Sequence, residues 1–200
     1  MANRAYLAVS DVRRIYPAFQ NPTFSTKENW VLCSAGCVPL LWLALFEEID
    51  LVTETFRSDQ GPVVATAPLA TRGQAVARLA QRRSLLNSLF EEEGGLDHHL
   101  GLFSSYLSSL RGAYVTMEVE EIACLHPDGE FDALLRNCLI GLSTGIPLVK
   151  DALVTLSTVI PDRRFITLED ARKGVYEQED MWNYFRIMGE HYLREDVPWM

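Results

Sequence analysis

Hydrophobic residues recur every three or four positions through most of the second half of the chain, which is the period of a helix with one buried face. The clearest example is the stripe Phe131, Leu134, Leu135, Cys138, Leu139 and Leu142. Further helices are predicted over residues 74–92, 97–110 and 148–159, and over a last segment with the stripe Met181, Tyr184, Phe185, Met188 and Tyr192. An apolar run at residues 38–48 predicts a central buried helix.

Two segments have the composition of strands. Residues 4–9 (RAYLAV) and 113–119 (AYVTMEV) are rich in β-branched and aromatic side chains. Residues 17–30 and 57–73 carry the Pro, Gly and polar residues that are typical of loops. The predicted fold class is therefore α+β, mainly α with a small β element. We expect a helical core and a short two- or three-stranded sheet that pairs residues 4–9 with 113–119.

The length and composition predict one domain. The chain has 200 residues, of which 48% are hydrophobic, and this is enough for a core of ordinary size. We expect a single helix-rich domain over 1–200, in which 143–200 form a closely packed helical extension. No apolar run approaches the ~18 residues that a membrane span needs. The first residues do not have the pattern of a signal peptide, so we expect a cytoplasmic protein.

Acidic residues outnumber basic ones, mainly in the second half of the chain. The formal net charge is −9. Residues 1–100 contain 9 basic and 11 acidic side chains, and residues 101–200 contain 9 basic and 16 acidic ones, which gives −2 and −7. This balance argues against direct binding to nucleic acid, because phosphates require clusters of Lys and Arg. It is compatible with a basic protein partner.

The sequence Gly-x-Ser-x-Gly occurs at residues 141–145 and raises the hypothesis of a serine hydrolase with Ser143 as nucleophile. Asp162 or Asp170 and His191 follow in a chain order that a catalytic triad allows. A nucleophile elbow, however, needs a strand, a tight turn and a helix. The residues before Ser143 have the period of a helix, so a small serine hydrolase remains an alternative only.

Other candidate chemistry has simpler explanations. In Asp97-His98-His99 the neighbouring side chains point about 100° apart on a helix, so they are expected to form a solvated helix start and not a metal site. Arg83 falls on an apolar helix face, where it needs either an ion-pair partner or an anionic ligand. The four cysteines lack zinc-site spacing and are expected to be buried reduced thiols. No metal and no cofactor is predicted.

Three segments resemble a bacterial family of unknown function whose members open with MANR-[SA]-Y-L. These segments are MANRAYL, then ENWVLCSAGCVPLLWLALF, and later GAYVTMEVEEIACLHPDGEFDALLRNCLIGL. The resemblance covers about residues 1–142. Some members of that family resemble immunity proteins, which are encoded beside secreted antibacterial toxins such as those of type VI secretion systems. The resemblance implies the same role for this chain, and it brings no catalytic residue with it.

We therefore expect a binding protein and not an enzyme. This protein would neutralise a basic toxin, most simply a nuclease, by protein–protein contact. It would touch neither nucleic acid nor membrane directly. A homodimer, or a homo-oligomeric structural or regulatory module that associates through apolar helices, is a further alternative. The residues expected to contact the partner are Glu118, Glu120, Glu121, Asp128, Glu130, Asp132 and Trp182.

Overall fold

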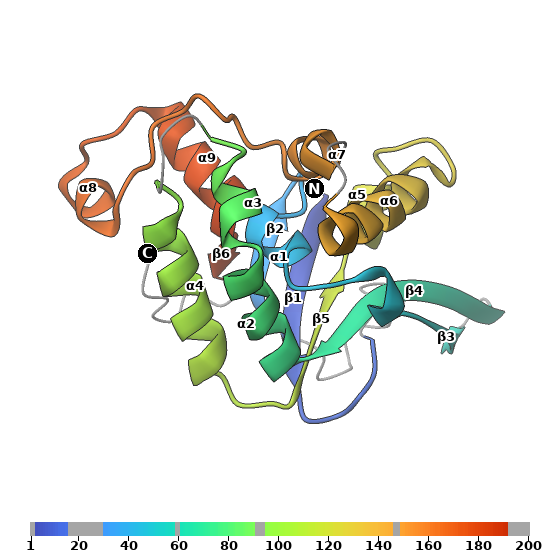
Figure 1. Ribbon diagram of the computed structural model, residues 1–200. Coiled ribbons are helices and arrows are strands. Elements are labelled where there is room, and N and C mark those ends of the chain that lie inside the picture. Colours follow the sequence, from blue (N-terminus) through green and yellow to red (C-terminus); the bar gives the residue numbers. More distant parts are fainter. Residues whose placement is uncertain (1–2, 16–29, 59–60, 91–94, 146–148, 192–200) are drawn as a thin grey trace.

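A computed structural model describes residues 3–15, 30–58, 61–90, 95–145 and 149–191 of the chain. Most of the expected loop at 17–30, the end of the helix expected over 74–92, and Tyr192 lie outside these residues. The described part contains a six-stranded antiparallel sheet in the order β3-β4-β5-β1-β2-β6. Figure 1 shows helices gathered around the centre of this sheet and one hairpin, β3–β4, that projects away from them.

Strand β1 (Arg4–Ser10) lies at the centre of the sheet. It pairs with β5 (Tyr114–Glu118), with Tyr6 opposite Glu118, and with β2 (Trp30–Ala35) on its other side. The expected pairing of residues 4–9 with 113–119 is therefore present. The short strand β6 (Glu190–His191) adds to the far edge of β2.

The expectation of a two- or three-stranded sheet is wrong, because residues read as a loop form strands. β3 (Leu51–Ser58) and β4 (Gly61–Thr71) pair along their whole length, from Leu51 opposite Pro68 to Ser58 opposite Gly61. Pro68 is tolerated because it lies where β4 leaves β3 and begins to pair with β5, at Leu69 opposite Thr116. A missing N–H costs little at such a junction.

Ten helical segments lie in the described residues. They are α1 (Leu40–Leu43), the 3₁₀ turn η2 (Glu48–Asp50), α2 (Arg72–Gln81), α3 (Arg83–Asn87), α4 (Asp97–Ser109), α5 (Glu120–Ala123), α6 (Glu130–Thr144), α7 (Val149–Ser157), α8 (Leu168–Lys173) and α9 (Gln178–Met188). The single helix expected over 74–92 is divided at Arg82 into α2 and α3, which run beside α4 (Figure 1).

The main core lies between the helices and one face of the sheet. Ala5, Leu7 and Val9 of β1 enter it, while Tyr6 and Ala8 face the other side with Trp30 and Cys33. This alternation is the normal consequence of the two-residue period of a strand. Side chains from α7 and α9 belong to the same core as those of α1, α4 and α6.

The expected central helix is buried as predicted, although only residues 40–43 are helical. Every side chain from Leu40 to Phe46 is inaccessible to solvent. Trp42 donates a hydrogen bond from Nε1 to the carbonyl of Met188, at 2.9 Å, which fixes α1 against the end of α9. Gly189 follows with φ +82°, and a Cβ there would lie 2.5 Å from the Trp42 ring, so the close approach requires glycine.

Candidate functional site

The expected carboxylates gather where α5 turns into α6. Glu120 and Glu121 lie on α5, and Glu130 and Asp132 lie in the first turn of α6. Asp128, Glu130 and Asp132 are exposed, and Glu120 and Glu121 are half-buried. We call these five residues the acidic corner. Asp128 lies in the turn that connects α5 and α6. No Lys or Arg occurs anywhere in residues 112–135, so no basic side chain of this segment offsets their charge.

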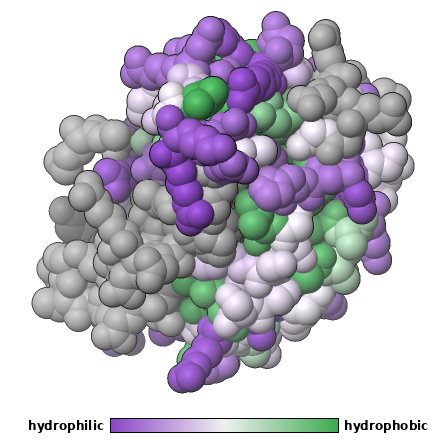
Figure 2. All heavy atoms as spheres, turned by 90° about the vertical axis from the view of Figure 1, so that its left-hand side faces the viewer, coloured by the Kyte–Doolittle hydropathy of each residue, from purple (hydrophilic) through white to green (hydrophobic). Residues whose placement is uncertain are grey.

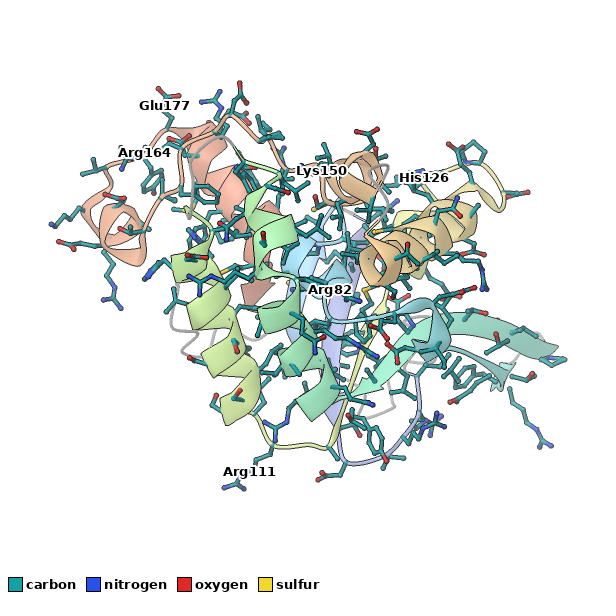
Figure 3. All side chains as sticks on the ribbon, in the orientation of Figure 1. Arg82, Arg111, His126, Lys150, Arg164 and Glu177 are labelled. Carbon is teal, nitrogen blue, oxygen red and sulfur yellow. The ribbon has the colours of Figure 1, made fainter. Side chains whose placement is uncertain are left out.

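Two of the expected contact residues do not belong to the acidic corner. Glu118 is only 4% exposed, and its Oε1 accepts a hydrogen bond from the backbone N–H of Glu120 at 2.7 Å, so it shapes the start of α5 from inside. Trp182 is exposed, but it lies on α9. Figure 3 places His126, in the α5–α6 turn, on the opposite side of the molecule from Glu177, which precedes α9.

The acidic corner also contains apolar and titratable groups. Leu125 is exposed in the turn between α5 and α6, and the ring of His126 packs at 5.4 Å from the ring of Phe131. Burial raises the pKa of Glu120 to about 7 because desolvation penalises the charged form. The charge of this surface therefore changes near neutral pH.

A second cluster, which the sequence did not reveal, lies under η2. Arg78 of α2 and Arg82, which lies between α2 and α3, are both buried, and we call them the arginine clamp. Arg82 donates to the carbonyls of Ala44 and Phe46, both at 2.7 Å, where the buried α1 segment ends. Figure 3 shows Arg82 in the interior of the molecule. Burial lowers the pKa of its guanidinium, and nearby Glu47 partly offsets this effect.

The arginine clamp also holds the two acidic ends of η2. Arg78 donates to Asp50 at 2.5 Å and to Glu47 at 3.0 Å, and Arg82 donates to Glu47 at 3.2 Å. The backbone N–H of Glu47 bonds in turn to Asp50 at 2.8 Å. Buried charges need this degree of pairing, because an isolated one would cost several kcal/mol. The spacing of four between the two arginines was the only signal of the clamp in the sequence.

Ser143 lies on a helix and not on a nucleophile elbow. It is exposed near the end of α6, and its hydroxyl donates to the carbonyl of Leu139 at 3.2 Å. The two glycines have structural causes. A Cβ on Gly141 would lie 2.7 Å from Cβ of Val149, so glycine lets α7 approach α6, and Gly145 ends α6 in a left-handed conformation with φ +69°.

The expected solvated helix start is wrong for His99, which is 1% exposed. Its Nε2 donates to the carbonyl of Ile166 at 3.1 Å, and the rings of Tyr184 and Phe165 lie 5.3 and 5.4 Å away. Burial, and to a smaller extent the neighbouring His98, lowers the pKa of His99 to about 4. The helix period placed His99 beside the apolar stripe, and packing against α9 buries it completely.

Arg83 has a partner in the chain itself. It forms a two-pronged ion pair with Asp97 at the start of α4, and Asn87 also donates to Asp97, at 2.8 Å. The Arg83 hydrogen bond is the main cause that lowers the pKa of Asp97. The side chains of Arg83 and Asp97 therefore pair with each other, so Arg83 does not need an anionic ligand.

A hollow of about 410 Å³ lies between the α7–α8 connection and the start of α9. Its lining includes Asp162 but not Ser143. Asp170, the other candidate acid, bonds to the backbone N–H of Thr167 and caps α8. The residues named for a catalytic triad are thus spread over different elements.

The remaining surface observations concern apolar groups. Figure 2 shows the face on the left of Figure 1, where the coloured hydrophobic residues form small groups separated by hydrophilic ones.

Cys33, Cys37 and Cys138 are buried thiols, whereas Cys124 is exposed. Cys33 lies on β2, so it does not face Cys37 across a helical turn. Among the described residues there is no cluster of metal-ligating side chains, and no helix is long and apolar enough to span a membrane.

Comparison of the chain with protein-family models, with curated proteins and with solved structures finds no match. The residues and their geometry are therefore the whole basis for assigning a function.

Proposed function

We propose that this chain is a cytoplasmic immunity protein that binds a basic antibacterial toxin, most simply a nuclease, and neutralises it by protein–protein contact. The observation that carries the proposal is the acidic corner. Five carboxylates, three of them exposed and two half-buried, gather on α5, at the start of α6 and in the turn between them, and no Lys or Arg interrupts residues 112–135. The protein acts by occupying a surface and not by turning over a substrate.

The acidic corner has the properties that such an inhibitor needs. A nuclease surface is basic because it holds phosphates, so a cluster of carboxylates competes with nucleic acid for it. Charges of one sign gathered on one side of a molecule raise the rate of association with an oppositely charged partner by factors of ~10 to ~1,000. This effect decreases as salt shortens the screening length to ~8 Å at physiological ionic strength.

The proposal is tested with the basic toxin domain encoded beside this protein, purified with a substitution that abolishes its activity. Surface plasmon resonance measures association at low and high salt. The neutralised variant carries Asp128→Asn, Glu130→Gln and Asp132→Asn. A matched control carries Glu169→Gln, Glu177→Gln and Glu179→Gln, which removes the same formal charge from exposed positions on α8, immediately before α9 and on α9.

We expect the first variant to associate at least ~10-fold more slowly than the wild type and to lose most of the salt dependence. The control variant should keep both. In cells, the first variant should also protect less well against the active toxin. If the wild type does not bind this toxin, or if the two variants lose association rate equally, the acidic corner is not the contact surface of an immunity protein.

A further inference from the structure

Ile49 is the most exposed large hydrophobic residue in the part of the chain that the structure describes, with 85% of its surface accessible. It stands at the middle of η2, between Glu48 and Asp50. An exposed leucine or valine on a loop needs no explanation. Ile49 differs because buried ion pairs and a capping box hold the turn that carries it.

The rigidity of this turn comes from the arginine clamp. Asp50 and Glu47 point inward to Arg78 and Arg82, and Glu47 and Asp50 also bond to each other's backbone in a capping box. Glu47 and Asp50 are directed into the protein, whereas Glu48 and Ile49 between them are exposed. The ion pairs thus hold the turn that presents Ile49 to solvent.

An ion pair joins the turn that carries Ile49 to α6. Glu48, the preceding residue, accepts a hydrogen bond from Arg136 of α6 at 2.7 Å. Asp132 lies one helical turn before Arg136 on the exposed side of α6. The contact between Glu48 and Arg136 therefore joins η2 to the acidic corner on one surface.

We propose that Ile49 is the apolar anchor of the interface with the basic toxin, and that it fills an apolar pocket on that partner. This inference rests on the proposed function and adds the residue that holds the complex together. Because Arg136 pairs with Glu48, the charge that selects the same basic partner comes from Asp132 and the rest of the acidic corner. Interfaces concentrate their binding energy in a few well-packed central side chains surrounded by polar groups.

A fixed anchor contributes differently from the carboxylates. Because the turn is already ordered, little side-chain or loop freedom is lost when Ile49 becomes buried in the complex. Burial of a branched aliphatic side chain is short-ranged and insensitive to salt, so Ile49 should act on dissociation. The carboxylates act over longer distances and should govern association.

The experiment compares Ile49→Ala with Val175→Ala on the same inactive toxin domain. Val175 is a β-branched residue that is 52% exposed, and it lies next to α8, away from η2 (Figure 1). Neither change should alter the midpoint of chemical unfolding, because both side chains are largely in solvent. We expect Ile49→Ala to dissociate at least ~10-fold faster with an unchanged salt dependence. Ile49→Val should restore most of the affinity, and Val175→Ala should leave it within about twofold.

The two proposals fail separately. If the wild type binds the toxin and Ile49→Ala dissociates at the wild-type rate, Ile49 is not an anchor, and the proposed function stands. If Val175→Ala loses as much affinity as Ile49→Ala, the effect is not specific to η2 and the inference is overturned. If the wild type does not bind, both proposals are wrong.

Discussion

Replacement of His99 by Gln should remove a large part of the loss of stability that acid causes in this protein. The imidazole is enclosed by Ile166, Phe165 and Tyr184, and its pKa falls from the ordinary 6.5 to about 4. Between these two pKa values the unfolded chain therefore binds a proton at His99, and the folded protein does not. The contribution of uncharged His99 to stability is complete above about pH 6.5 and is lost as the pH falls toward about 4.

The magnitude follows from the shift in pKa. A difference of ~2.5 units at ~1.36 kcal/mol each gives a total of about 3 kcal/mol, of which about 2.5 kcal/mol is lost between pH 7.5 and pH 4.5. Gln can still donate to the carbonyl of Ile166 and does not titrate. His99→Gln should therefore be less stable than the wild type at neutral pH, yet lose about 2.5 kcal/mol less on acidification.

The assay is urea unfolding followed by circular dichroism at several pH values between about 4.5 and 7.5. The matched control is His98→Gln, because His98 precedes His99 on α4 and is exposed. It should keep the pH dependence of the wild type almost unchanged. The reasoning is refuted if the two variants show the same dependence of the unfolding free energy on pH.

Three further substitutions test other parts of the structure. Arg82→Met should lower the unfolding free energy by ~3–5 kcal/mol, because it leaves the carbonyls of Ala44 and Phe46 without their donor and weakens the hold on Glu47, and urea titration measures this loss. Gly189→Ala should lower the thermal midpoint strongly, since the added Cβ would lie 2.5 Å from the Trp42 ring at φ +82°, whereas Gly174→Ala, with no atom within 4 Å, should cost only the strain of its φ of +67°. Glu120→Gln should raise the unfolding free energy above about pH 7. Burial raises the pKa of Glu120, so the wild type loses stability as the pH rises through about 7, whereas Gln does not titrate. Equal pH profiles of the unfolding free energy for the two proteins would contradict this.

Several elements were predictable because their information is local. The stripe from Phe131 to Leu142 predicts α6, which extends from Glu130 to Thr144, and the stripe from Leu96 to Leu107 predicts α4. Residues 113–119 predict β5. In each case the side chains that repeat along the sequence are the ones that pack against the core, so the period alone identifies the element.

The β3–β4 hairpin was not predictable in this way. Gly61, Pro62 and Pro68 are ordinary loop residues, and they are compatible with strands here only because of where the pairing partners lie. Arg82 likewise reads as one more residue of a long helix. Its role at the end of α1 depends on Ala44 and Phe46, which precede it by more than 30 positions.

The candidate site was likewise predictable only in part from the sequence. Composition showed that residues 112–135 are acidic, but the sequence could not show that Glu118 is buried, or that Trp182 lies on α9 and outside the acidic corner. Nor could it single out Ile49, whose turn is held by Arg78 and Arg82 from beyond the hairpin.

The sequence by itself determined the helices with a regular apolar stripe, the central strand pair and the sign of the charge on the second half of the chain. Only the tertiary structure decided the size of the sheet, the burial of His99 and the outward position of Ile49. The physical reason is that helix periodicity and charge are properties of neighbouring residues, whereas strand pairing, desolvation and ion pairing depend on groups that the fold brings together from distant parts of the chain.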